Sequence, residues 1–325
     1  MKNASVFHNI STKCLVLGTA ADLLEESRSY GFSIFSFVII GINFVAALFA
    51  IVCNSAVIYI LSRIPSLVTP SNILILGLAI SDFMVGIFSQ PFSCVVHYSF
   101  LARKSSLLCT GAKIYDSSVN ALGTASFLTL VAITADRYLA VRLHLRYLEL
   151  VTVKRCGIVI FCIWNFSIFI FTLRQFNEFF QKENQVFFYI LSSIGVLVFI
   201  TLLLLVGFFL FNISRTIRRH SRQIQAQQHS IQQSMNQSIN MPKYKKSVNT
   251  MYFVIGAFAL CYAPYALGLI ISDVAQVNIS PYFKRFHLFA VTETFVMCNG
   301  LFNPIIYCWK IKEIRIALLQ VIRRI

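Results

Sequence analysis

Two short motifs place polar side chains where an apolar helix makes them costly. Asp136-Arg137-Tyr138 stands at the end of one apolar stretch, and Asn303-Pro304-Ile305-Ile306-Tyr307 lies inside a later one. A charged or polar group in or beside hydrocarbon is expensive unless it is paired or faces a cavity, and it usually marks function. The chemistry available to these residues is reversible ion pairing and hydrogen bonding at a membrane boundary.

The composition indicates that the helices carrying these motifs span a membrane. Of the 325 residues, 57% are hydrophobic and 12% are charged, whereas a soluble domain has about 25% charged residues. A membrane span needs about 20 apolar residues, so we expect an all-α membrane protein built as a seven-transmembrane helix bundle. The apolar runs lie at 34–62, 71–96, 110–141, 156–174, 186–211, 248–271 and 287–309.

The formal net charge of +16 reflects an uneven distribution of Lys and Arg along the chain. The asymmetry follows the positive-inside rule, which places the N-terminus outside and the C-terminus inside. A basic inner rim attracts anionic headgroups, so the charge predicts contact with membrane lipids and no nucleic-acid partner. Of the 28 basic residues, one lies in 63–70, five in 137–155, seven in 212–246 and five in 310–325.

This topology divides the chain into an extracellular N-terminal tail at 1–33, a bundle at 34–309 and a cytoplasmic segment at 310–325. The tail carries glycosylation acceptors at Asn3 and Asn9, which are useful only on the outer side. It lacks the pattern of a cleaved signal peptide, so we expect the first span to direct insertion.

The cytoplasmic segments contain two candidate helices. In 310–325, apolar residues recur at helical spacing between basic ones, which predicts an amphipathic helix on the inner leaflet; a frayed tail is the alternative. The third cytoplasmic loop, 212–246, leaves two interpretations open. Its Gln, Ser and Asn content is typical of a flexible linker, but a spacing of seven favours continuation of the fifth helix. The residues with that spacing are Leu210, Ile217, Ile224 and Ile231.

Six landmarks lie in order along these spans: Asn54, Asp82, Asp136-Arg137-Tyr138, Trp164, Cys261-Tyr262-Ala263-Pro264 and Asn303-Pro304-Ile305-Ile306-Tyr307. Their order resembles that of class A (rhodopsin-like) G-protein-coupled receptors over residues 34–325. The resemblance implies a plasma-membrane receptor, not an enzyme, that binds an extracellular ligand and activates a heterotrimeric G protein, with arrestin as a further possible partner.

The resemblance also implies a conformational switch on the cytoplasmic side. Arg137, neutralised by Asp136 at rest, would be freed to cap helix ends of an entering partner. Pro264 and Pro304 remove backbone hydrogen bonds and leave kinks, about which the sixth helix would swing outward to open a crevice. The remaining switch residues are Tyr138, Tyr262, Asn303 and Tyr307.

Asp82 is a lone carboxylate in an apolar helix, so it needs partners or a cation. By resemblance, polar residues of three other helices converge on it and form a hydrated pocket for sodium, an allosteric modulator; no other cofactor is expected. The alternative is a protonated, hydrogen-bonded Asp82 that serves packing only. The converging residues are Asn54, Ser126, Asn299 and Asn303.

The chain departs from the family pattern on the outer side. The second outer loop, expected at 174–185, has no cysteine, and Cys109 lies about one turn before the family position, which matches Ala112. The usual disulfide is therefore expected to be absent. Three states remain open for Cys109: a bond to Cys14, a bond to Cys94, or a free thiol.

Other departures concern the resting state and the branch of the family. Tyr262 replaces the sixth-helix tryptophan, and no acid lies near Tyr244 to bind Arg137 across helices. A weak resting lock, and hence basal activity, is expected. The proline-free fifth helix and cysteine-free outer loop are similar to the branch of melanocortin, lysophospholipid and cannabinoid receptors, and adenosine receptors share part of this pattern.

Two acids in the outer halves of spans, Asp116 and Glu293, are the best ligand candidates, with Asn120 in the same set. The aspartate of amine receptors falls at Val119 and the asparagine of adenosine receptors at Leu269, which disfavours both ligand classes. We therefore expect a cationic peptide or small molecule. The alternatives are a neutral lipid, with the carboxylates satisfied locally, and, for the whole chain, a transporter or channel.

Overall fold

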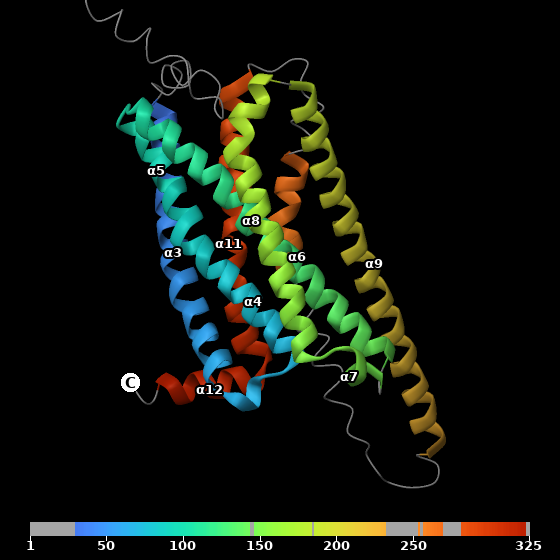
Figure 1. The fold of residues 1–325 in the computed structure, drawn as a ribbon. Coiled ribbons are helices and arrows are strands. Elements are labelled where there is room, and N and C mark those ends of the chain that lie inside the picture. Colours follow the sequence, from blue (N-terminus) through green and yellow to red (C-terminus); the bar gives the residue numbers. More distant parts are fainter. Residues whose placement is uncertain are drawn as a thin grey trace, which may run out of the picture.

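The computed structural model describes residues 30–143, 146–183, 185–231, 253, 256–268 and 281–322. Long helices pack side by side, and a short one lies across the base of the bundle (Figure 1). The helices are α3 (Tyr30–Arg63), α4 (Pro70–Met84), α5 (Gln90–Leu101), α6 (Ser105–Leu143), α7 (Tyr147–Leu150), α8 (Val153–Glu183), α9 (Gln185–Ile231), residues 256–268, α11 (Pro281–Lys310) and α12 (Lys312–Ile322).

The second span is one rod made of three parts. Thr69 caps its first turn by accepting a hydrogen bond from the backbone N–H of Asn72, and Pro70 occupies the first helical position, where its missing N–H costs nothing. Between α4 and α5, residues Val85–Ser89 form a π-helical turn, η2, just before Pro91. A proline inside a helix removes a backbone bond, and the wider turn accommodates that loss.

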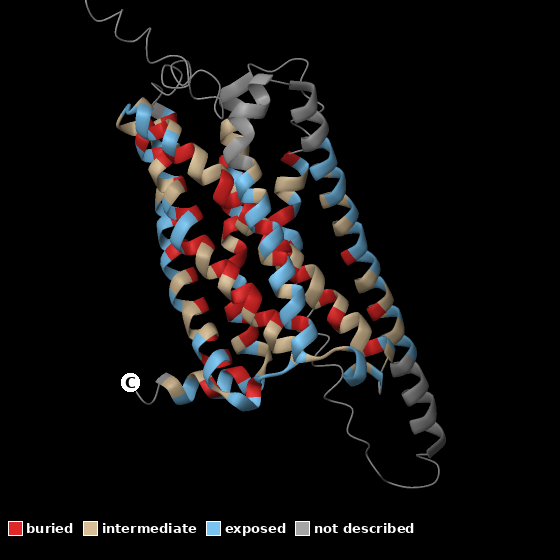
Figure 2. Ribbon diagram, viewed as in Figure 1, coloured by how far each residue is buried: buried red, intermediate tan, exposed pale blue. Residues whose placement is uncertain are grey.

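Six of the described helices are long and apolar enough to cross a membrane. Their buried residues face the centre of the bundle, whereas α3 and α9 expose much of their surface (Figure 2). Large apolar side chains lie on that surface, including Phe37, Phe49, Leu204 and Phe211. Exposed aromatic and aliphatic side chains of this density fit lipid rather than water, so the composition-based prediction of a helical membrane protein is confirmed.

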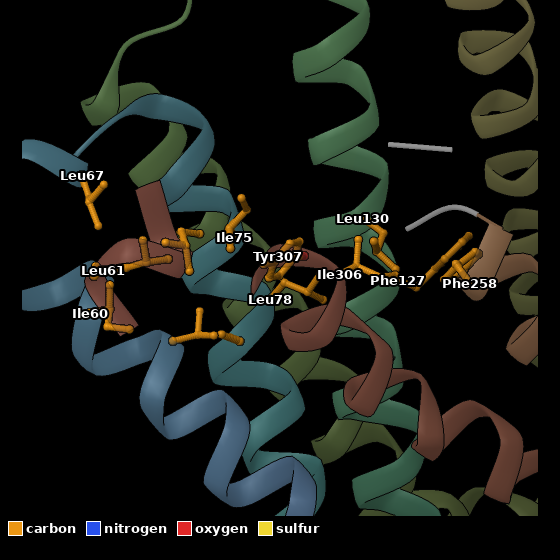
Figure 3. Packing of buried hydrophobic residues seen from close by; sticks show 14 of the residues in the cluster. Ile60, Leu61, Leu67, Ile75, Leu78, Phe127, Leu130, Phe258, Ile306 and Tyr307 are labelled. Atoms are coloured by element: carbon orange, nitrogen blue, oxygen red, sulfur yellow. The ribbon is translucent and has the colours of Figure 1, made fainter. Parts of the chain in front are cut away.

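The main core lies in the inner half of the bundle. It joins the first, second, third, sixth and seventh spans to α12, whose Ile314 is fully buried. Residues from α3, α4, α6 and α11 meet there, with Phe258 packed beside Phe127 (Figure 3). A mobile frayed tail would not bury Ile314, so the predicted helix within 310–325 is confirmed over Lys312–Ile322.

The structure corrects the expectation about the second outer loop and decides between the two interpretations of the third cytoplasmic loop. The expected outer loop at 174–185 is wrong, because α8 continues to Glu183 and α9 begins at Gln185. Polar composition marks where a helix leaves hydrocarbon, and it does not mark where the helix ends. On the inner side, α9 continues to Ile231, so the helical alternative is correct over that part of 212–246.

Cys109 is disulfide-bonded, which excludes the free thiol among the three states left open by the sequence. Cys94 is a free thiol and lies 3.6 Å, Sγ to O, from the carbonyl of Ile40 on α3. Because its thiol is free, Cys94 is not the partner of Cys109. The alternative partner, Cys14, lies outside the described residues, as do the glycosylation acceptors Asn3 and Asn9.

Candidate functional site

At the cytoplasmic end of α6, the side chain of Asp136 is buried and held by three elements. Its Oδ2 accepts a hydrogen bond from Ser71 Oγ of α4 at 2.8 Å, and its Oδ1 accepts one from Tyr147 Oη of α7 at 2.6 Å. Arg137 Nε lies 3.4 Å from Oδ2, and the Arg137 side chain is 29% exposed. The carboxylate is thus anchored, whereas its cationic partner keeps access to the cytoplasmic side.

Tyr147 was not among the residues predicted from sequence. Burial, and after it the hydrogen bond to Asp136, raises the pKa of Tyr147 to about 12. Its hydroxyl therefore remains protonated at physiological pH and stays a donor. The Tyr138 ring stacks on Phe209 of α9 with centroids 5.0 Å apart, and Arg142 contacts the Tyr138 hydroxyl and ring. The end of α6 is thereby tied to α7 and α9.

Midway along the bundle, Asp82 is 2% exposed and bonded to two of its predicted partners. Asn303 Nδ2 donates to Oδ2 at 2.8 Å, and Ser126 Oγ lies 3.2 Å from Oδ1. Gly300 permits this approach of α11 to α4, because a Cβ there would lie 3.0 Å from the Asp82 Cβ. Asn54 instead bonds to the carbonyls of Ala50 and Gly300, so its contribution to a hydrated pocket at Asp82 stays a prediction.

A small cavity opens beside Asp82. It is lined by Asp82, Val85, Ser89, Val119, Gly123, Ser126, Tyr262, Val296, Met297, Asn299 and Gly300. Both polar atoms of the Asn299 amide and Oδ1 of Asn303 are buried without a hydrogen-bond partner in the described part of the chain. Unpaired oxygens around one carboxylate suit a hard cation with water, so the residues present fit a monovalent metal ion.

Below this cavity, aromatic rings connect α6 to the helix at 256–268. Tyr262 stacks on Phe258 with centroids 4.1 Å apart and on Phe127 at 6.0 Å, and its hydroxyl lies 3.5 Å from the Gly123 carbonyl. Tyr262 therefore occupies the junction between the cavity and the inner core. Pro264 follows it in the same helix, and Pro304 lies inside α11.

The inner end of the sixth span also contacts the end of α11. The Phe253 ring lies 5.2 Å from the Trp309 ring, centroid to centroid. Lys310 Nζ lies 4.2 Å from the Phe253 centroid and 3.5 Å from that of Trp309. This cation–aromatic cluster was not predicted from the sequence, where lysine beside tryptophan at a helix end gives only a weak signal.

On the outer side, each predicted ligand-binding acid has a local partner. Tyr115 Oη donates to Glu293 Oε2 at 2.8 Å and so links α6 to α11. Asn120 Nδ2 donates to Asp116 Oδ1 at 3.1 Å within α6. Val119 lies deeper, packed with Val85 and Met297 in an apolar layer above the Asp82 cavity. Leu269 falls outside the described residues.

A bundle of membrane-spanning helices with a buried carboxylate cavity and an anchored Asp-Arg pair defines a multi-pass membrane receptor. The sequence model of the seven-transmembrane receptors of the rhodopsin family matches residues 53–307. The chain therefore belongs to the rhodopsin family of G-protein-coupled receptors, which are receptors of the plasma membrane and not enzymes.

Individual relatives agree with this assignment without selecting one ligand class. The chain is 26% identical to melanocortin receptor 5 of Mus musculus over 81% of this chain and 77% of that receptor. It is 25% identical to adenosine receptor A2a of Canis lupus familiaris over 89% and 73%. It is 26% identical to trace amine-associated receptor 1 of Macaca mulatta over 84% and 83%.

Proposed function

We propose that this G-protein-coupled receptor responds to an extracellular cationic peptide or small cationic molecule bound near Glu293 and Asp116. The observation that carries the proposal is the placement of Glu293, half-buried on α11 and hydrogen-bonded to Tyr115 across the bundle. An ammonium or guanidinium group would add a charge-assisted hydrogen bond to this carboxylate. At the deeper position, the apolar layer of Val85, Val119 and Met297 offers no ion pair to a monoamine.

The experiment is guanine-nucleotide exchange in membranes that contain the receptor and a panel of heterotrimeric G proteins. Cationic peptides and amines should include an agonist, and neutral lipids should be poor agonists. Exchange driven by a neutral lipid, with every cationic candidate inactive, would instead favour the lipid-receptor alternative. Ion flux or substrate uptake without nucleotide exchange would favour a transporter or channel.

On the inner side, we propose that activation separates Arg137 from Asp136. Asp136 would stay anchored by Ser71 and Tyr147, so the arginine is the group free to rotate toward the G protein. Tyr138, Tyr262, Pro264, Asn303, Pro304 and Tyr307 would form the rest of this switch. The buried Tyr307 hydroxyl has no hydrogen-bond partner among the described residues, which supports a side chain that finds its partner in another conformation.

The cavity at Asp82 is proposed to hold sodium, with Ser126, Asn299 and Asn303 as neighbouring ligands or water carriers. The ion would stabilise the inactive packing of α4 against α6 and α11, because its ligands come from all three helices. Asp82→Asn should therefore abolish the sodium dependence of agonist affinity, since the carboxylate supplies the negative charge lining this cavity. The measurement is agonist competition binding in sodium chloride against choline chloride.

Ser62→Ala is a suitable control for Asp82→Asn, because Ser62 is exposed and its hydroxyl bonds only the nearby Tyr59 carbonyl. This variant should keep the full sodium effect. A sodium effect of native size in Asp82→Asn would place the ion elsewhere.

The cluster of Phe253, Trp309 and Lys310 is proposed to restrain the sixth span at rest. It would do so in place of an ion pair to Arg137, because the sequence has no acid near Tyr244. An exposed cation–π contact contributes about 0.5–1 kcal/mol, equivalent to about a two- to fivefold change in an equilibrium constant. Phe253→Leu should therefore raise ligand-free nucleotide exchange by about that factor. Phe253→Tyr, which keeps the ring, should leave it unchanged, and equal basal rates in all three proteins would contradict the restraint.

A further inference from the structure

Three side chains in the outer half of the bundle are fully buried, and neither the switch nor the ligand proposal uses them. Asn43 of α3, Ser89 of η2 and Gln90 of α5 are each 0% exposed. Among the residues that the structure describes, no hydrogen-bond partner contacts either polar atom of the Gln90 amide, Ser89 Oγ or Asn43 Oδ1. Burying a polar group without a partner is costly, and buried polar groups in folded proteins are nearly always paired, often by ordered water.

The helix register brings Gln90 opposite Asn43. The first and second spans run antiparallel, and a Cβ on Gly86 would lie 3.3 Å from the Ala47 carbonyl oxygen. Two turns further out, Cys94 Sγ lies 3.6 Å from the Ile40 carbonyl oxygen. The π-helical turn places Gln90 one turn beyond Val85 and Gly86, and Gln90 lies one turn before Cys94. Its level on α3 therefore falls between Ala47 and Ile40, at Asn43.

A third helix completes the site. Asn43 Nδ2 donates to Thr294 Oγ1 of α11 at 3.1 Å and to the Ile39 carbonyl at 3.0 Å. These two bonds use both amide hydrogens and aim Oδ1 away from them. Thr294 directly follows Glu293, whereas Ser89 lines the Asp82 cavity on the other side. The site therefore lies between the outer acids and that cavity.

We infer that Asn43, Ser89 and Gln90 form a binding site for ordered water at the junction of the first, second and seventh spans. A water molecule supplies two donors and two acceptors, which match the two amide oxygens that need donors and the Gln90 amide that needs an acceptor. The three residues are neutral, so the site suits water rather than a cation. It hydrates the Asp82 cavity from the outer side, around the apolar layer of Val85, Val119 and Met297.

The test is thermal unfolding of the purified receptor with Gln90→Met, a change of similar size and shape. If water occupies the site, the variant removes the Gln90 amide that helps to hold the water, leaves Asn43 Oδ1 and Ser89 Oγ unpaired, and lowers the melting temperature. If the site is dry, the same change removes two unpaired polar atoms and raises the melting temperature, which overturns the inference. Thr129→Val is the control, because the buried Thr129 hydroxyl bonds only its own helix, at Ala125 O; it should have little effect.

Two further readouts exclude the remaining occupants. A density map at atomic resolution should show a solvent peak that contacts Gln90 and Asn43, and a direct amide–amide bond without that peak overturns the inference. In the Asp82→Asn background, replacing choline chloride by sodium chloride should not change the melting temperature. A sodium stabilisation that persists there and disappears on Gln90→Met would identify a cation and also overturn it.

Discussion

Arg137→Ala is expected to abolish agonist-stimulated nucleotide exchange while the receptor remains folded and at the cell surface. The reason is that Asp136, and not Arg137, makes the hydrogen bonds that hold this end of α6 to α4 and α7. Asp136 is buried and bonded to Ser71 and Tyr147, whereas the Arg137 side chain is 29% exposed with its Nε at 3.4 Å from the carboxylate. Removing the guanidinium therefore removes the group offered to the G protein and leaves the anchors in place.

The measurement for this variant is nucleotide exchange normalised to surface expression, with ligand binding as a test of folding. Arg142→Ala is the matched control, because Arg142 is a second arginine one turn further along α6 that contacts Tyr138. It should retain exchange within about fivefold of the native rate, the largest loss that a surface contact of less than about 1 kcal/mol permits. Native exchange by a surface-expressed Arg137→Ala receptor would refute the proposed role.

Asp136→Asn should behave differently from Arg137→Ala for the same structural reason. It weakens the acceptors used by Ser71 and Tyr147 as well as the ion pair, so it disturbs folding and the resting state together. Comparing the two variants separates the anchoring role of Asp136 from the switching role of Arg137. The sequence motif alone does not distinguish these two roles.

The sequence predicted the helices and their landmarks well, because apolar length and ordered motifs are properties of single segments. The contact between Asp82 and Asn303 is an example, since one carboxylate within an apolar span requires a partner at the same depth. Asn54 shows the limit of this reasoning. Its depth was correct, but the rotation of α3 directs its amide to the Gly300 carbonyl.

Contacts that depend on helix rotation or on short connections could not be predicted. The bond between Tyr147 and Asp136 depends on where α7 lies beside the end of α6, and the bond between Tyr115 and Glu293 depends on how α6 and α11 face each other. The outer loop expected at 174–185 failed for a different reason. Hydropathy reports contact with lipid, and a helix can continue beyond the hydrocarbon, as α8 does.

The difference between properties of single segments and contacts between helices also explains why the site in the outer half could not be predicted from the sequence. Asn43, Ser89 and Gln90 appear in the sequence as isolated polar residues within apolar runs. Their convergence becomes visible only when the register between α3 and the second span is known. Sequence reasoning can therefore identify which polar residues need partners, but the partners follow from packing.

Glu293→Gln is expected to weaken agonist potency by about tenfold or more, equivalent to about 1.4 kcal/mol. A hydrogen bond to a charged group contributes about 1.5–3 kcal/mol, and the neutral amide of the variant loses the charge while keeping the size. Asp116→Asn should produce a similar loss if both acids face one cationic ligand. The measurement is the concentration response of nucleotide exchange to the agonist found by screening.

Tyr115→Phe separates the charge of Glu293 from its positioning. It removes the 2.8 Å hydrogen bond to Oε2 but leaves the carboxylate, so a cationic agonist should lose less potency than with Glu293→Gln. Replacing the cationic group of the agonist by a neutral one should abolish the difference between native receptor and Glu293→Gln, because the variant can lose only an interaction that the ligand makes. If the agonist is an uncharged lipid and neither acid affects its potency, the outer carboxylates serve helix packing, and the neutral-lipid alternative replaces the cationic one.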